Sequence, residues 1–159
     1  MKAVVLAVLS GLALVLGGVG FHLCGALEEA NDAAEDRRAA VQVAKAHAMH
    51  LMSISHDSVD QDIRRLLATS TGPAKEAYTR NAAKLKATTV DDKVVQTGVL
   101  RAAGLVSMEG GVARVLVVAD VLIRWEGSKT PAQERFYRWD MKVTKVGGTW
   151  LVSEAEQVQ

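Results

Sequence analysis

Residues 112–125, VARVLVVADVLIRW, alternate between two kinds of side chain with a period of two. One face of this run is uniformly apolar, and the other carries Arg114, Asp120 and Arg124. The apolar positions are Ala113, Val115, Val117, Ala119, Val121, Ile123 and Trp125. Because successive side chains of a strand point to opposite faces of its sheet, the pattern predicts a strand with one buried face.

The same period continues on both sides of this strand. Residues 94–108 precede it across the turn Glu109-Gly110-Gly111. Residues 133–146 follow it, and the two-residue turn Gly147-Gly148 joins them to residues 149–155. Since short turns connect antiparallel neighbours, the C-terminal half is predicted to form a four-stranded antiparallel meander.

Upstream of the sheet, the apolar period becomes that of a helix. Residues 28–55 contain neither Pro nor Gly. A second helix is predicted from a capping box of Ser58 and Gln61 to Gly72, and a third begins at Pro73. The first of these helices has a narrow apolar seam that should pack against a partner helix or against its own domain. The seam consists of Ala34, Val41, Ala44, Ala48 and Leu51. Helices followed by antiparallel strands predict an α+β fold, with helices packed on a curved sheet.

The first 27 residues carry a single charged side chain, Lys2. The run from Ala3 through Leu14 and Phe21 to Leu27 is uncharged, and at about 1.5 Å per residue it can span a hydrocarbon core of about 30 Å. It exceeds the apolar region of a cleaved signal peptide, so we expect an uncleaved single-pass anchor in the cell membrane. Lys2 and the free amine lie before it and acidic residues follow it, and because basic residues stay in the cytoplasm we expect the C-terminal domain outside.

The predicted organisation is therefore a transmembrane anchor at residues 1–27, an alanine-rich stalk helix at residues 28–56 and an extracytoplasmic α+β domain at residues 57–159. The 159-residue chain has a formal net charge of only +1, which excludes a basic nucleic-acid binder. Cys24 is the only cysteine, which excludes a disulfide-stapled fold.

Several segments in this order resemble a known family. They are the anchor, the alanine-rich helix, residues 57–68, Thr71-Gly72, Tyr78, residues 94–98 (VVQTG) and residues 148–152 (GTWLV). In order and spacing they look like the mammalian-cell-entry (Mce) associated membrane proteins of mycobacteria and related actinobacteria. The resemblance implies a nuclear-transport-factor-like, or cystatin-like, cone outside the membrane, similar to inner-membrane scaffold subunits of type IV secretion systems.

The resemblance also implies a function in the cell envelope. Proteins of this family act beside Mce complexes, which import lipids such as fatty acids and sterols. The implied role is that of a non-catalytic accessory subunit whose partners are Mce subunits or the permease, together with the lipid bilayer. No cofactor is expected.

Motifs that carry chemistry are almost absent from the sequence. It has no Walker lysine loop, no dinucleotide glycine fingerprint and no paired cysteines for zinc. His47 and His50 are three apart on the stalk helix and His56 follows, but no Cys or carboxylate shares their spacing. A solvated helix face is therefore expected rather than a metal site.

Two alternatives to the accessory role follow from the cone fold. An isomerase-like enzyme would use Asp120 or Asp140 as its base, although pairing of these carboxylates with Arg114, Arg124 or Arg138 is the more economical account. A lipid-binding module would hold its ligand in a cavity lined by aromatic side chains. The aromatic residues that form either the core or such a cavity are Tyr78, Trp125, Tyr137, Trp139 and Trp150.

Overall fold

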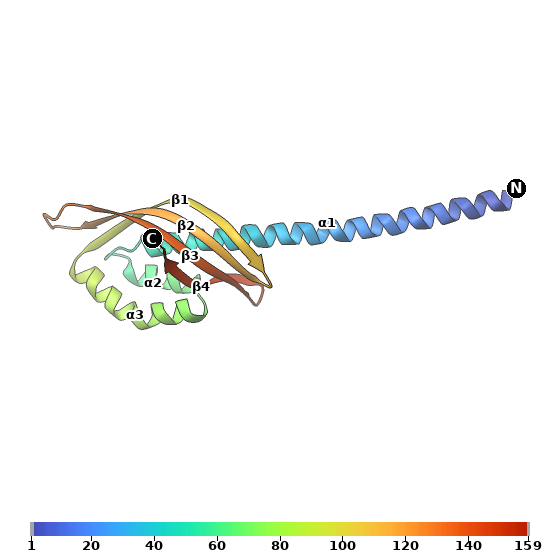
Figure 1. Ribbon diagram of the computed structural model, residues 1–159. Coiled ribbons are helices and arrows are strands. Elements are labelled where there is room, and N and C mark those ends of the chain that lie inside the picture. Colours follow the sequence, from blue (N-terminus) through green and yellow to red (C-terminus); the bar gives the residue numbers. More distant parts are fainter. Residues whose placement is uncertain (1, 159) are drawn as a thin grey trace. The chain divides into compact units, whose positions relative to one another are not determined.

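The computed structural model describes the backbone of residues 2–158 and the side chains of residues 27–158. It contains three helices followed by four strands (Figure 1). These are α1 (Lys2–Met52), α2 (Val59–Ala68), α3 (Gly72–Asp91), β1 (Val94–Glu109), β2 (Val112–Trp125), β3 (Gln133–Val146) and β4 (Thr149–Gln157). The chain divides into two compact units, Met1–Asp36 and Arg37–Gln159, so the boundary falls within α1.

The predicted membrane anchor belongs to the first unit. Its named residues Ala3, Leu14 and Phe21 lie outside the residues whose side chains are described, whereas Leu27 is 64% exposed. Among the described residues, no helix combines the length and the apolar character needed to cross a membrane.

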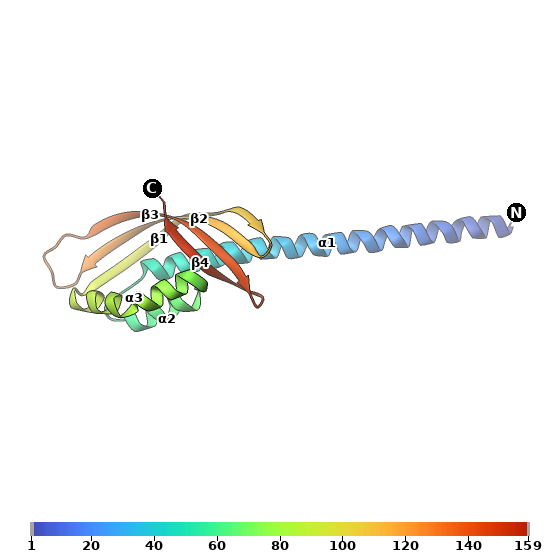
Figure 2. The ribbon, with the colours of Figure 1, turned by 60° about the horizontal axis from the view of Figure 1, so that its bottom comes forward.

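The second unit has the predicted α+β architecture. Its sheet has the order β1-β2-β3-β4 with every neighbouring pair antiparallel, which confirms the meander. The helices of this unit lie on one face of the sheet (Figure 2). Strands β2 and β3 have the predicted bounds, whereas β1 is one residue longer and β4 two residues longer than predicted.

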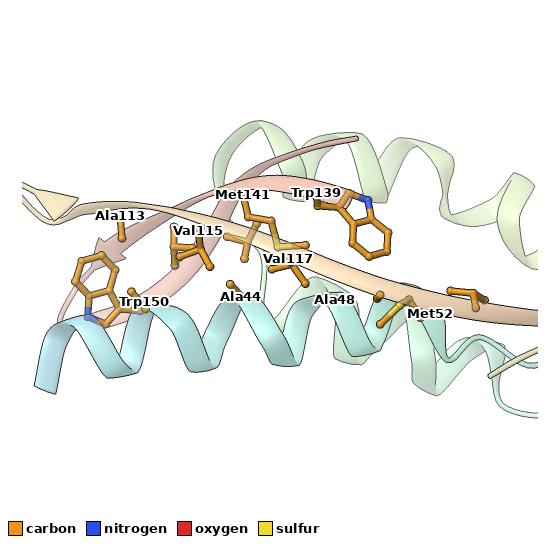
Figure 3. Close-up of a cluster of buried hydrophobic side chains, with 14 residues drawn as sticks. Ala44, Ala48, Met52, Ala113, Val115, Val117, Trp139, Met141 and Trp150 are labelled. Atoms are coloured by element: carbon orange, nitrogen blue, oxygen red, sulfur yellow. The ribbon is translucent and has the colours of Figure 1, made fainter. Parts of the chain in front are cut away.

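The core lies between α1 and the inner face of β2 (Figure 3). Helix residues Ala40, Ala44, Ala48 and Met52 are at most 1% exposed, and so are the β2 residues Ala113, Val115, Val117 and Ala119. Small side chains at four-residue spacing let the helix approach the sheet closely. The predicted seam residues Ala44 and Ala48 thus pack against the chain's own sheet, while Val41 and Leu51 are half-buried beside them.

Gly98 permits a close crossing between α1 and β1. A Cβ atom built at this position would lie 2.4 Å from the Cβ atom of Met52 and 3.1 Å from its sulfur. Since Met52 is itself fully packed, no side chain other than hydrogen fits at residue 98 without a shift of the backbone. The last residue of α1 therefore rests directly on the first half of β1.

The connections between helices differ from the sequence prediction at two points. Ser58 makes no side-chain cap to the backbone, because its hydroxyl donates instead to Asp62 Oδ2 at 2.7 Å, so the predicted capping box is wrong. Helix α2 ends at Ala68, before the predicted Gly72, because the backbone that follows pairs with β4. In that pairing Val152 N donates to Thr69 O and Thr71 N donates to Val152 O.

Candidate functional site

The outer face of the sheet, which points away from the helices, exposes a group of apolar side chains. We call Val99, Leu116, Val118 and Phe136 the outer patch; they are 48%, 42%, 36% and 71% exposed. Antiparallel register places Asp120 between Val99 and Phe136, so one row crosses β1, β2 and β3. The alternation that buries one face of β2 therefore leaves large apolar groups in solvent on the other.

Two ion pairs lie on the same face as the outer patch, one through Asp120 between Val99 and Phe136 and one through Asp140 beside Leu116. Arg101 Nε donates to Asp120 Oδ2 at 2.5 Å, and Arg114 Nε donates to both oxygens of Asp140 at 2.9 and 2.7 Å. The hydrogen bond with Asp140 raises the pKa of the Arg114 guanidinium. Because these cations are largely exposed, the pairs contribute little to folding stability, but they fix the charges around the patch.

The two candidate catalytic carboxylates both belong to this face. Asp140 pairs with Arg114, which confirms one of the predicted cross-strand contacts, whereas Asp120 pairs with Arg101 of β1 rather than with any of the three predicted arginines. The Asp120 and Asp140 side chains are 25% and 17% exposed. An ion-paired carboxylate on an open sheet face lacks the apolar enclosure that a catalytic base in a cone-shaped pocket would have.

The aromatic residues occupy several different environments. Trp139 and Trp150 are 8% and 4% exposed and belong to the core cluster (Figure 3). The Tyr137 ring stacks on the Trp139 ring with centroids 5.0 Å apart. Trp125 lines a surface groove of about 480 Å³, and Tyr78 contacts the imidazole of His47 from α3. The five residues therefore do not line one common cavity.

A buried polar cluster joins the three helices of the second unit. His47 of α1 is 0% exposed, its Nδ1 lies 2.9 Å from Thr69 Oγ1 at the end of α2, and its Nε2 lies 3.2 Å from the Tyr78 hydroxyl of α3. The expected solvated helix face is therefore wrong for His47. The error arose because alanine-rich helices give little contrast between their buried and exposed sides.

The shortest contacts of Thr69 favour one tautomer of His47. The single Thr69 hydroxyl proton is donated to Leu66 O at 3.0 Å, so Thr69 Oγ1 accepts from Nδ1–H of His47. Nε2 then accepts the hydrogen of the Tyr78 hydroxyl. Burial, and then the charge of nearby His50, lowers the pKa of His47 to about 4, and burial raises the pKa of Tyr78. Both groups are thus neutral at physiological pH.

Comparison with known proteins identifies relatives along nearly the whole chain. The family described as "Uncharacterized protein Rv1363c/MT1408-like" matches residues 2–159. "Uncharacterized protein Rv1363c" of Mycobacterium tuberculosis (strain ATCC 25618 / H37Rv) is 25% identical over 141 residues. That match covers 89% of this chain and 54% of the relative, so the chain spans about half the length of the curated protein it matches.

Solved structures with this fold include extracytoplasmic domains. The periplasmic domain of DotI has a TM-score of 0.60 at 15% identity, covering 74% of this chain and 91% of that chain. The VirB8 protein of Agrobacterium tumefaciens has a TM-score of 0.57 at 11% identity, covering 78% and 92%. At these identities the likeness shows a shared fold and no more.

Proposed function

Because the chain belongs to the Rv1363c/MT1408-like family, we propose that it is a non-catalytic, membrane-anchored accessory protein that assembles or stabilises an Mce-type lipid import complex. The partner follows from the sequence resemblance to Mce-associated membrane proteins. The anchor is residues 1–27, and the α+β domain stands outside the cytoplasm. The cargo of the importer is a fatty acid or sterol, which the accessory protein does not itself transform.

The outer patch carries the proposal. The patch consists of four exposed apolar side chains on neighbouring strands. Exposing such a surface to water does not stabilise an isolated domain, and such surfaces mark sites of protein association. The arginine–aspartate pairs on the same face add polar groups to this surface, and interfaces commonly combine apolar and polar contacts. We infer that a subunit of the importer covers the outer patch.

The fold supports an extracytoplasmic scaffold. It is shared with the periplasmic domain of DotI and with an IcmL-like type IV secretion system protein of Legionella pneumophila. The ion-paired state of Asp120 and Asp140 favours a non-catalytic role, since each carboxylate is already held by a guanidinium.

Affinity purification from mild detergent tests this function. We expect Mce subunits and permease components to be recovered with the full chain, as identified by mass spectrometry. A Leu116→Glu/Phe136→Glu double variant should no longer recover these components. It places two carboxylates in the contact, and their loss of water on binding costs free energy. Val146→Glu is the matched control: Val146 is also exposed, at 48%, but it lies at the β3–β4 turn, outside the patch.

Two outcomes would contradict the proposal. If importer components are recovered no better with the full chain than with an anchor-only fragment, the importer is not the partner. If the double variant and the wild type recover these components equally, the outer patch is not the surface that binds the importer. Unchanged thermal midpoints of the variants establish that any loss of partners reflects the surface rather than the fold.

A further inference from the structure

The imidazole of His56 lies between two carboxylates that come from separate parts of the chain. Its Nε2 is 2.6 Å from Glu126 Oε2, and its Nδ1 is 3.2 Å from Asp57 Oδ1. The His56 side chain is 15% exposed, while those of Asp57 and Glu126 are 79% and 63% exposed. One ligand atom from each of the three residues lies within 4.8 Å of the ligand atoms of the other two.

The backbone positions this cluster. His56 N donates to Val94 O and Glu126 N donates to Lys93 O, both at 2.9 Å. Two consecutive carbonyls at the start of β1 therefore hold the loop after α1 and the loop after β2 side by side. Lys93 adopts a left-handed conformation, with φ of 48°, at the turn from α3 into β1. The three side chains are thus brought together by the fold and not by their spacing in sequence.

The two contacts of the imidazole cannot both be satisfied by neutral histidine. A neutral ring has one N–H and one lone pair. If Nε2–H donates to Glu126, the Nδ1 lone pair faces the oxygen of Asp57, and two electron-rich atoms then oppose each other at 3.2 Å. A metal ion between Nδ1 and Asp57 Oδ1 would be bound by both atoms and would remove this repulsion.

We propose that His56, Asp57 and Glu126 form a binding site for a divalent transition-metal ion such as Zn²⁺. Zinc binds His nitrogen and carboxylate oxygen at about 2.0–2.2 Å, so donors 3.2 Å apart subtend about 100° at the ion, close to a tetrahedral angle. Glu126 then holds the opposite ring nitrogen, which is the carboxylate–histidine–metal arrangement that fixes ligand orientation in metalloproteins. An imidazole ligand favours Zn²⁺ over Mg²⁺, which prefers oxygen ligands.

The surroundings leave the site open on one side. The groove of about 480 Å³ beside it is lined by Ser55, Asp57, Val95, Arg124, Trp125 and Glu126. Solvent can therefore supply the remaining ligands. The two carboxylates give the cluster a formal charge of −2, which the nearby Arg124 reduces without removing.

Isothermal titration of Zn²⁺ into the full chain, purified in detergent without a polyhistidine tag, tests the site. We expect saturable binding of one ion per chain and a higher thermal midpoint with Zn²⁺ than with Mg²⁺. His56→Gln and Asp57→Asn should each abolish saturable binding, and Glu126→Gln should weaken it by about 10–100-fold, as loss of a partner of a metal ligand does. Asp92→Asn, which alters another exposed carboxylate, should bind Zn²⁺ as the wild type does.

Absence of saturable Zn²⁺ binding to the wild type would overturn the site. Binding that survives in both His56→Gln and Asp57→Asn would place the ion elsewhere and would equally contradict the proposal. Because all three side chains lie at the surface or in loops, circular dichroism should show folded variants, and a change in binding can be assigned to the ligands.

Discussion

Replacing Trp150 with alanine should lower the free energy of unfolding by about 3–5 kcal/mol, as truncation of a buried aromatic does. The Trp150 side chain is 4% exposed in the core cluster, and Lys145 Nζ lies 5.7 Å from the centroid of its ring. The substitution would open a cavity where β4 and α1 meet (Figure 3). Chemical denaturation of the full chain, followed by circular dichroism, measures this loss.

Asp92→Ala supplies the comparison for this prediction. Asp92 is exposed after α3, and its backbone N–H, which donates to Thr88 O at 3.1 Å, is retained in the variant. We expect a change of less than about 0.5 kcal/mol, as for ordinary surface substitutions. Equal thermal midpoints for Trp150→Ala and Asp92→Ala would show that the sheet core has been assigned wrongly.

Acidification should destabilise the fold through His47. Its pKa is about 4 in the folded state and about 6.5 in the unfolded chain, so the unfolded state binds a proton first as the pH falls. The contribution of neutral His47 to the free energy of unfolding is therefore fully present above pH 6.5, and it is lost progressively between pH 6.5 and pH 4. At pH 4 the loss from this one group amounts to about 3 kcal/mol.

His47→Gln isolates this effect from the titration of carboxylates. Glutamine keeps a donor and an acceptor for Thr69 and Tyr78 but cannot gain a proton in this range. The free energy of unfolding of the variant should therefore fall less steeply than that of the wild type between pH 6.5 and pH 4. Identical slopes for the two proteins would contradict the buried, neutral state of His47.

The sheet could be predicted from sequence because its signal is local. The strict alternation in β2 and the turns Gly110-Gly111 and Gly147-Gly148 each report on the few residues around them. The bounds of β2 and β3 consequently match the prediction. The edge strands β1 and β4 run longer than predicted, because polar residues beyond the apolar pattern still pair with the neighbouring strand. Glu109 pairs with Val112, and Glu156 and Gln157 pair with Asp140 and Trp139.

The sites could be predicted only in part, because their residues meet through the fold. Arg101 stands at an irregularity of β1 between Leu100 and Ala102, and it pairs with Asp120 of the neighbouring strand. Glu126 lies 70 residues after His56, and no periodicity connects them. The polar contacts of His47 likewise depend on two other helices, which is why the spacing of histidines on one helix gave the wrong environment.

The sequence did indicate where the outer face of the sheet would lie, since Arg114 and Asp120 define it in β2. It did not indicate that Phe136 would stand 71% exposed there, because an aromatic residue in a strand usually predicts burial. An exposed aromatic side chain beside ion pairs is the feature that links the fold to the proposed docking role.

A protease-protection assay tests the central claim, that an anchored domain stands outside the cytoplasm where an importer can bind it. Protease added to spheroplasts should degrade residues 37–159 without lysis, while a cytoplasmic marker protein stays intact. If the domain is cleaved only after the membrane is lysed, it lies inside the cell. That result would contradict the orientation and the importer-docking role together.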